Sequence, residues 1–385
     1  MVQSAMICDL MRSLGNRRPW ILMEQASAHV NWRQRNATKR PGMMRLISYQ
    51  AVARGADGIM FFQWRASKAG SEKHHSGMVP HNGTASRVWR EVKAFGNELP
   101  KLDPLFASEV KAEVAILLDW ENWWALELDG KPSNDLRLMP QITSYYEPLY
   151  RRNITVDFAH PESDLSSYKL VIAPNLYLVK DHAVENLNRY VENGGNLVTT
   201  FFSGIVDENE HIRLGGYPAP FREMLGLGVE EYVPYGTSEF NTINTADGKQ
   251  FQCTFWGDVI HLKNAKAIAT FNSDYYAGGA AMTHNVFGKG NTFYVGTVPD
   301  QNGIDWLLEQ ACKKAGINPV TANSPVEVEI LQRSNGKSVW LFVLNHSKKK
   351  VIVPLEQHGT DLLTGTAVNG SLELEPTGIA IVQIN

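Results

Sequence analysis

The chain has 385 residues, 43% of them hydrophobic and 20% charged, and a formal net charge of −3. This composition is normal for a globular protein and argues against disordered and fibrous classes, and the length suits two or three domains of about 100 to 200 residues each. The small net charge, without a long run of one sign, argues against nucleic acid or a membrane surface as a partner, and no stretch reaches the roughly 18 apolar residues that span a bilayer.

The three cysteines, Cys8, Cys253 and Cys312, are far apart and never form a C-x-x-C pair. They predict neither a disulfide framework nor a cysteine zinc site, and a reducing cytoplasm is the simplest location. The N-terminal segment is interrupted by Asp9 and Arg12 and lacks the basic start and long apolar stretch of a signal peptide. We therefore expect no metal, no cofactor and no export by an obvious route.

Two units of a strand followed by a helix are predicted in the first part of the chain. The expected strands cover residues 20–23 and 58–62, and the expected helices cover residues 39–54 and 85–99. The strands are continuous apolar runs of the kind that is buried on both faces of a parallel sheet, and the helices carry apolar residues three and four positions apart. This βαβα order is typical of α/β folds, and Pro104 marks a plausible end of a first domain, residues 1–104.

A second α/β pattern fills residues 105–319 and predicts a middle domain with a mixed sheet. The expected strands are residues 114–118, 155–158, 170–173, 196–202, 251–255, 267–271, 280–286 and 291–295, and the expected helices are residues 141–151, 183–192 and 304–315. Residues 193–195, Asn-Gly-Gly, suit the C-terminal cap of the second helix.

Short alternating strands follow in residues 320–385. They are expected at residues 326–331, 338–344, 350–354, 359–363, 371–374 and 378–383. Asn335 and Gly336 are typical of a β-hairpin turn. These residues predict a compact antiparallel β domain that is small enough to need support from its neighbours.

Glu24 is the first candidate for chemistry. It follows the apolar strand at residues 20–23, and the carboxyl ends of the strands form the catalytic face of a (β/α)₈ barrel. A rigidly held, ionised carboxylate in that place suits a nucleophile for cleavage of a glycoside. The alternative is an ordinary glutamate at the start of a loop.

The residues around Glu24 resemble those of a sugar subsite. Trp32 and the aromatic group Phe61, Phe62 and Trp64 offer flat apolar surfaces to a pyranose ring. Glu72, His74 and His75 lie in the loop after the second strand, where a carboxylate and an imidazole can hydrogen-bond to sugar hydroxyls. Core positions for the aromatic residues and a solvated loop for the others are the alternatives.

Five segments carry a resemblance to a known family. They are residues 19–25 (PWILMEQ), 30–32 (VNW), 39–42 (KRPG), 55–65 (GADGIMFFQWR) and 72–77 (EKHHSG). In this order they are similar to glycoside hydrolase family 42 β-galactosidases, and the similarity extends through the whole chain. The resemblance implies that Glu24 is the nucleophile, that Trp32 is a wall of the galactose subsite, and that Glu72 and His75 bind hydroxyls.

The same resemblance implies an architecture and a reaction. The fold class would be α/β: a partial TIM barrel comprising its last two βα units, a flavodoxin-like α/β middle domain that mediates trimerisation, and a small antiparallel β C-terminal domain. The substrate would be a terminal non-reducing β-D-galactose residue of a galactoside or galacto-oligosaccharide. Hydrolysis would be by retaining double displacement, in a homotrimer formed through the middle domains and without a cofactor.

The chain also departs from the family pattern. A complete barrel takes about 250 residues, whereas only about 100 precede Pro104, so the acid/base glutamate and a cysteine cluster of the first half have no counterpart. We expect the chain by itself to be inactive as a β-galactosidase.

A non-catalytic, self-associating module is the second hypothesis. Trp120, Trp123 and Trp124 cluster after one expected strand and suit an apolar interface patch, a contribution to a neighbouring subunit's active site, or core packing. The same bulky residues argue against a phosphate-binding loop. Cys253 and Cys312 fall in an expected strand and an expected helix, which argues against a cysteine nucleophile.

Overall fold

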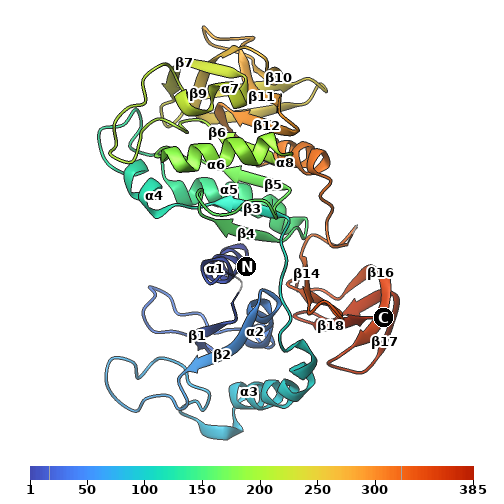
Figure 1. The fold of residues 1–385 in the computed structure, drawn as a ribbon. Coiled ribbons are helices and arrows are strands. Elements are labelled where there is room, and N and C mark those ends of the chain that lie inside the picture. Colours follow the sequence, from blue (N-terminus) through green and yellow to red (C-terminus); the bar gives the residue numbers. More distant parts are fainter. Residues whose placement is uncertain (17, 322) are drawn as a thin grey trace. The chain divides into compact units, whose positions relative to one another are not determined.

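The computed structural model describes residues 1–16, 18–321 and 323–385. The chain forms two compact units (Figure 1). Unit 1 comprises Met1–Lys111, Arg151–Asn153 and Pro319–Asn385, and unit 2 comprises Ala112–Tyr150 and Ile154–Asn318. The first and last segments of the chain thus belong to one unit, whereas the proposed division at residues 104 and 319 into three domains stays a prediction.

The first segment of unit 1 alternates helices and strands. Its elements are α1 (Val2–Leu14), β1 (Trp20–Ala26), α2 (Met43–Ala53), β2 (Ala56–Phe62), η1 (Gly83–Ala85), α3 (Arg87–Glu98) and η2 (Leu99–Leu105). Both predicted strand-and-helix units are present, and β1 pairs with β2 in parallel. Helix α2 begins at Met43 rather than at residue 39, because Gly42 before it has a φ of +79°, a left-handed conformation that a helix interior does not contain.

The prediction that β1 and β2 are buried on both faces is wrong. Helices cover one face, where Trp20, Leu22 and Ile59 pack against Cys8, Ala51 and Ala56. On the other face Ile21 is 52% exposed, Met23 is 68% exposed and Met60 is 50% exposed. An apolar strand shows which side chains gain stability from burial, but burial also requires another element that packs on them.

The C-terminal segment of unit 1 is a five-stranded antiparallel sheet in the order β14-β15-β18-β16-β17. Its strands are β14 (Val328–Ser334), β15 (Val339–Asn345), β16 (Val351–Asp361), β17 (Ala367–Leu374) and β18 (Ile379–Ile384). Strand β16 is one long strand where two short strands were expected, with a register shift between Pro354 and His358 against β17. The predicted hairpin is confirmed, since β14 and β15 pair as far as Ser334 and Val339 around Asn335 and Gly336.

The two segments of unit 1 share an apolar core and a buried charged cluster. Tyr49 and Phe95 from the helices pack with Phe342 and Ile381 from the sheet. Next to this core, Arg54 at the end of α2 pairs with Asp9 of α1 and, at 2.8 Å, with Glu329 of β14. Asp9, Arg12, Arg54 and Glu329 are all at most 3% exposed. Helix α1 was not predicted because Asp9 and Arg12 interrupt its apolar pattern; they are buried as an ion pair instead of facing water.

Unit 2 is built on an eleven-stranded mixed sheet in the order β13-β9-β8-β10-β11-β12-β6-β5-β3-β4, with β7 paired to β9. Its strands are β3 (Val114–Leu117), β4 (Val156–Ala159), β5 (Leu170–Ala173), β6 (Asn196–Thr200), β7 (Leu227–Pro234), β8 (Phe240–Thr245), β9 (Gln250–Leu262), β10 (Lys266–Phe271), β11 (Ala280–Phe287), β12 (Gly290–Val295) and β13 (Thr297–Pro299). Its helices are α4 (Trp120–Leu126), α5 (Leu138–Arg151), α6 (Asp181–Glu192), η3 (Ala219–Phe221), α7 (Arg222–Leu225) and α8 (Gln301–Ala315).

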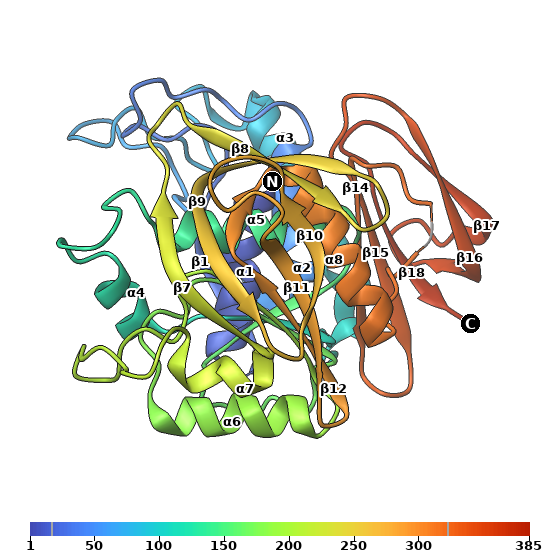
Figure 2. The ribbon, with the colours of Figure 1, turned by 90° about the horizontal axis from the view of Figure 1, so that it is seen from above.

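Helices cover both faces of this sheet. Helices α6 and α7 lie together on one side (Figure 2), and their buried residues join those of β3, β5 and β6 in one core that includes Leu187, Met224 and Val171. Helix α8 contacts β5 and β6 from its own apolar face, which contains Leu307 and Leu308. The expected mixed α/β middle segment is therefore confirmed, although α4, α7, β7, β8 and β13 were not predicted.

Candidate active site

Glu24 lies in an irregular part of strand β1. Leu22 pairs with Ile59 and Gln25 pairs with Phe61, so Met23 and Glu24 together oppose the single residue Met60. Such a β-bulge bends the strand and redirects the side chains in it. Glu24 is exposed, and within residues 18–321 its carboxylate makes no hydrogen bond or ion pair.

The strand end directly after Glu24 is fixed by a half-buried cation. The ammonium of Lys39 donates to Gln25 Oε1 at 3.0 Å and to the carbonyl of Ala26. Burial, with a smaller effect of Arg33, lowers the pKa of Lys39 to about 8. Because Gln25 is only 7% exposed and is held by Lys39, the backbone that carries Glu24 has a defined position.

His75 is clamped between two aromatic rings. Trp32 stacks on it with ring centroids 5.2 Å apart, and Phe62 meets it edge to face at 5.0 Å. The Nδ1 atom of His75 lies 2.8 Å from the carbonyl oxygen of Ser76. A carbonyl only accepts, so Nδ1 carries the proton and Nε2 presents a lone pair.

That lone pair has no hydrogen-bond partner in the described part of the chain, although His75 is only 1% exposed. Trp32, in contrast, is 60% exposed, so the ring face that does not stack on His75 is open. A buried acceptor without a partner costs free energy, which a ligand hydroxyl would recover.

The loops after β1 and β2 are joined to each other beside this clamp. The backbone of Ala28 donates to Ser76 Oγ at 3.0 Å, and Asn31 Nδ2 donates to the carbonyl of Ser71 at 2.8 Å. Between the loops is a polar cavity of about 400 Å³, lined by His29, Val30, Asn31, Asn36, Ser71, His74 and His81. Glu72 lies in the second loop, where its carbonyl accepts from the backbone of His75 at 2.9 Å.

The predicted site residues thus divide into two groups. Trp32, Phe62 and His75 are in contact, and Glu24 lies on the strand that ends beside them, without a hydrogen bond to any of the three. Phe61 instead packs into the core of unit 1, and Trp64 packs edge to face on Trp89, with centroids 5.8 Å apart.

Gln25 and Lys39 were not singled out in the sequence. The sequence could have identified both residues, since each falls in a segment that carries the family resemblance. What the sequence did not indicate is that Lys39 reaches back over the intervening loop to the strand end.

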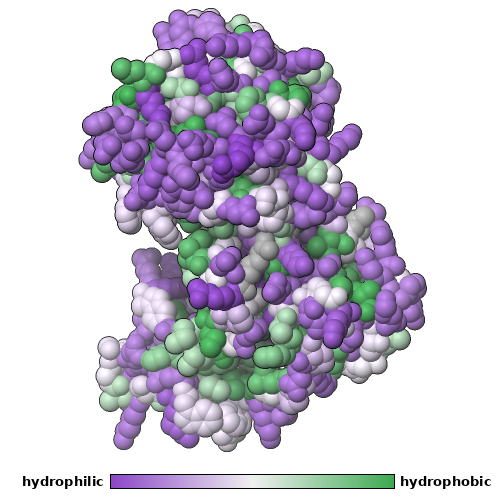
Figure 3. All heavy atoms as spheres, viewed as in Figure 1, coloured by the Kyte–Doolittle hydropathy of each residue, from purple (hydrophilic) through white to green (hydrophobic). Residues whose placement is uncertain are grey.

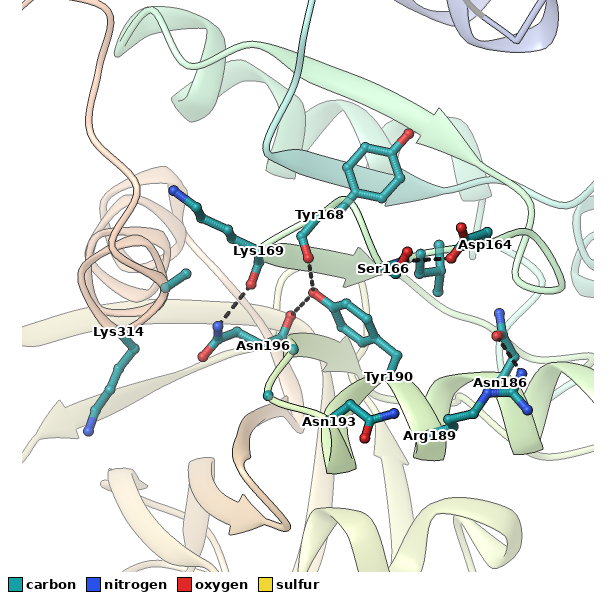
Figure 4. A pocket seen from close by; sticks show the side chains of 14 residues that line it. Asp164, Ser166, Tyr168, Lys169, Asn186, Arg189, Tyr190, Asn193, Asn196 and Lys314 are labelled. Carbon is teal, nitrogen blue, oxygen red and sulfur yellow. Dashed lines mark hydrogen bonds between the residues drawn. The ribbon is translucent and has the colours of Figure 1, made fainter.

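A second polar cavity, of about 590 Å³, lies in unit 2 (Figure 4). Its polar groups bond to each other: Tyr190 donates to the carbonyls of Tyr168 and Asn196, each at 3.2 Å, and Asn196 Nδ2 donates to the carbonyl of Lys169 at 2.8 Å. The cavity lies where β5 and β6 begin, whereas ligands of α/β sheets bind where strands end. We therefore assign these residues to structure.

The tryptophans of unit 2 are partly on the surface. Trp120 and Trp123 stack with centroids 5.4 Å apart, yet Trp120 is 39% exposed and Trp124 is 67% exposed. Core packing therefore does not account for Trp124. Burial raises the pKa of Cys253 to about 11, so this thiol in strand β9 is not poised as a nucleophile.

Within the described ranges, no helix has the length and apolar character needed to cross a bilayer. The same residues contain no cluster of three or more His, Cys, Asp or Glu side chains arranged to hold a metal ion.

Three family models match successive parts of the chain. Residues 1–102 match a β-galactosidase model, residues 112–318 match the β-galactosidase trimerisation domain, and residues 326–383 match the β-galactosidase C-terminal domain. Among curated proteins, β-galactosidase BgaB of a Geobacillus species is 50% identical over 386 residues, which cover 99% of this chain and 57% of the relative. β-Galactosidase LacZ of Heyndrickxia coagulans is 45% identical, over 98% of this chain and 56% of its own length.

Solved structures agree with these matches. A β-galactosidase from Bacillus circulans sp. alkalophilus superimposes with a TM-score of 0.97 at 39% identity, covering 100% of this chain and 58% of that chain. Gan42B, a family 42 β-galactosidase, superimposes with a TM-score of 0.95 at 35% identity, covering 99% of this chain and 56% of its own. The chain therefore spans somewhat more than half the length of the relatives that it matches.

Proposed function

Since the chain belongs to the glycoside hydrolase family 42 β-galactosidases, we propose that it supplies the nucleophile and part of the galactose subsite of an enzyme that hydrolyses terminal non-reducing β-D-galactose residues. The observation that carries the proposal is the buried, unpartnered Nε2 of His75 beside the open face of Trp32. Both residues lie in the loops that follow the bulged strand of Glu24 and its neighbour β2.

In the proposed reaction, Glu24 attacks the anomeric carbon. Its exposed carboxylate forms the bond to C1 while the glycosidic bond breaks, which gives a galactosyl-enzyme and a departing alcohol. A second carboxyl group, about 5 to 5.5 Å away in retaining enzymes, protonates the leaving oxygen and then removes a proton from the water that hydrolyses the ester. The configuration at C1 is retained.

The remaining residues bind the sugar. Trp32 offers its open ring face to the apolar C–H face of galactose. His75 accepts a hydrogen bond from a hydroxyl through Nε2, and Glu72 accepts a second, charge-assisted one. Nε2 is free to accept because Nδ1 carries the ring proton and donates it to the carbonyl oxygen of Ser76.

The acid/base carboxyl is proposed to come from further β/α units that continue the β1–β2 sheet. The support is the uncovered apolar surface of unit 1: Ile21, Met23 and Met60 on the strands, and Ile7 at 55% and Leu14 at 55% exposure on α1. A groove of about 610 Å³ also lies beside β2, lined by apolar residues that include those of α3 and η2. In Figure 3, hydrophobic residues reach the surface over the part that holds β2 and α3.

Consistent with this, we propose that the chain without those units has no useful β-galactosidase activity. An absent general acid alone costs roughly 10² to 10⁴ in rate.

The fold class is part of the same proposal. We propose that β1, α2, β2 and α3 are the last two βα units of a TIM barrel, and that the sheet of unit 2 is of the flavodoxin-like class. A cytoplasmic location is proposed on the three buried cysteines, Cys8, Cys253 and Cys312, all free in the described chain.

The test uses the chain alone and the chain fused to the part of BgaB that it does not span. We expect no turnover of a nitrophenyl β-galactoside by the chain alone and turnover by the fusion, with the β-anomer released first in an NMR time course. Glu24→Gln should abolish turnover in the fusion, whereas Glu208→Gln, at an exposed glutamate of unit 2, should leave it unchanged. A Glu24→Gln fusion that keeps its activity would refute the assignment.

A self-associating module is the second candidate function, and it is compatible with the first. The exposed Trp124 and Trp120 favour it, together with the match of residues 112–318 to a trimerisation domain. We propose a homotrimer formed through unit 2. Light scattering of the purified chain should give three times the monomer mass, and a stable monomer at micromolar concentration would contradict the proposal.

A further inference from the structure

A surface pocket in unit 2 combines aromatic rings with carboxylates. It has a volume of about 400 Å³ and is lined by Val233, Tyr235, Ser238, Glu239, Phe240, Asn241, Ser273, Asp274 and Tyr276. These residues come from the end of β7, the start of β8 and the loop between β10 and β11. The volume is within the range of roughly 300 to 1,000 Å³ that is common for small-molecule sites.

The floor of the pocket is a fixed pair of tyrosines. The hydroxyls of Tyr235 and Tyr276 are 2.7 Å apart and bond to each other, and Tyr276 is only 7% exposed. The pair depends on Gly257 of β9, because a Cβ there would lie 2.6 Å from the Tyr235 hydroxyl and 3.2 Å from that of Tyr276. Asn241, 4% exposed, interacts with both hydroxyls.

The polar wall is held in place by backbone contacts. Asn241 Oδ1 accepts from Ser273 Oγ at 2.6 Å and its Nδ2 donates to the carbonyl of Ser273 at 3.0 Å, which ties the loop to β8. Glu239 accepts from the backbone of Gly236 at 2.7 Å through one oxygen, and Asp274 accepts from the backbone of Tyr275 at 2.7 Å through one oxygen. In the described chain the second oxygen of each carboxylate has no hydrogen-bond partner.

The mouth of the pocket is apolar on one side. Phe240, the first residue of β8, is 61% exposed. Its exposed ring offers a flat apolar surface to the C–H groups of a sugar ring.

The charge of the lining selects the class of ligand. Two carboxylates and no cationic side chain line the pocket, so an anion would be repelled. The two carboxylates are fewer than the three acidic, imidazole or thiol side chains of a metal-binding cluster, and the described residues contain no such cluster. A neutral polyhydroxyl ring can donate to the remaining carboxylate oxygens of Glu239 and Asp274, and its apolar face covers Phe240.

We propose that this pocket is a second, non-catalytic binding site for one neutral pyranose ring, such as a terminal galactose unit. It lies in unit 2, whereas Glu24, Trp32 and His75 belong to unit 1. The inference rests on the chemistry of the pocket and does not require that the chain hydrolyse a glycoside.

Saturation-transfer NMR and calorimetric titration of the full chain with methyl β-D-galactopyranoside test the proposal. With few polar contacts and one aromatic face, we expect a Kd on the order of 1 mM. Phe240→Ala and Asp274→Asn should each weaken binding by about tenfold. Asn tolerates the left-handed backbone of Asp274, whose φ is +75°, so this variant should fold.

Three controls make the outcome decisive. Phe106→Ala removes an 81% exposed phenylalanine of unit 1 and should leave the Kd unchanged. Trp32→Ala removes the proposed catalytic subsite and should also leave this Kd unchanged, which separates the two sites. Thermal unfolding checks that each variant is folded.

The proposal is overturned if the sugar does not bind at tens of millimolar concentration, if Trp32→Ala abolishes all binding, or if folded Phe240→Ala binds as the parent does. Tighter binding of choline than of the sugar, sensitive to Asp274→Asn, would overturn it in favour of an organic cation. None of these outcomes depends on activity, so they do not coincide with failure of the proposed catalytic role of Glu24.

Discussion

Replacing Asp258 by asparagine should stabilise unit 2 at alkaline pH and not at acidic pH. Asp258 lies on β9 and is 2% exposed. Its Oδ1 accepts from the indole N–H of Trp256 at 2.8 Å, and its Oδ2 accepts from the hydroxyl of Tyr294 at 2.7 Å. In the described chain no cationic side chain pairs with it, so the carboxylate relies on these two dipoles alone.

Burial dominates the two hydrogen bonds and raises the pKa of Asp258 from 3.8 to about 7. The unfolded carboxyl ionises near pH 4 and the folded one near pH 7, so between these values the folded state binds more protons. The free energy of unfolding therefore decreases as pH rises through this window and stays lower above it. At 1.36 kcal/mol for each pKa unit, the cost of the ionised Asp258 is at most about 4 kcal/mol.

Asp258→Asn removes the ionisation and keeps the shape. The amide oxygen can accept from Trp256, and the amide N–H₂ can donate to the hydroxyl oxygen of Tyr294, much as the protonated acid does. At pH 8 the variant should be more stable than the parent by up to about 4 kcal/mol, and near pH 4 the two should be equal within about 1 kcal/mol. In a unit of about 200 residues, each kcal/mol is worth about 2 to 4 °C in Tm.

Scanning calorimetry of both proteins from pH 4 to pH 9 measures this difference. Asp129→Asn, at an exposed aspartate of the same unit, is the matched control and should show no such pH-dependent gain. A variant that is less stable than the parent at pH 8, or a difference in stability that does not change with pH, would refute the reasoning. Either result means that the hydrogen bonds to Asp258 compensate the burial of its charge.

Three further results are expected from unit 1 and from the surface of unit 2. Glu329→Gln should destabilise unit 1 by about 3 to 5 kcal/mol in urea unfolding, since it removes one of the two carboxylates that pair with buried Arg54. Burial opposes ionisation of Glu329, but the charge of Arg54 outweighs it and lowers the pKa of Glu329 to about 2. The stabilisation of unit 1 by ionised Glu329 is therefore fully present above pH 4.5 and should be lost as pH falls toward 2. Lys39→Met should lower kcat of the fusion enzyme by about 10- to 100-fold by releasing Gln25, with little change in Tm; an unchanged kcat would contradict the positioning role. Trp124→Ser should weaken self-association in light scattering, and an unaltered oligomer would exclude this patch from the interface.

The sequence by itself determined most elements and the identity of the family. Apolar runs and their period located β1, β2 and the parallel strands of unit 2, because these patterns reflect which side chains avoid water. The same reasoning placed Glu24 directly after a strand at residues 20–23, whereas β1 continues to Ala26 and contains Glu24. The hairpin at Asn335 and Gly336 was predictable because it depends on local backbone preferences alone.

Tertiary structure decided the features that depend on contacts between distant residues. The bulge that places Glu24 opposite Met60 arises from pairing with β2, which no local pattern encodes. The lone pair at Nε2 of His75 is defined only once the ring is packed against Trp32 and Nδ1 donates its hydrogen bond to the carbonyl of Ser76. Local propensity sets what a segment can form, whereas burial, register and protonation are set by the neighbours that the fold brings to it.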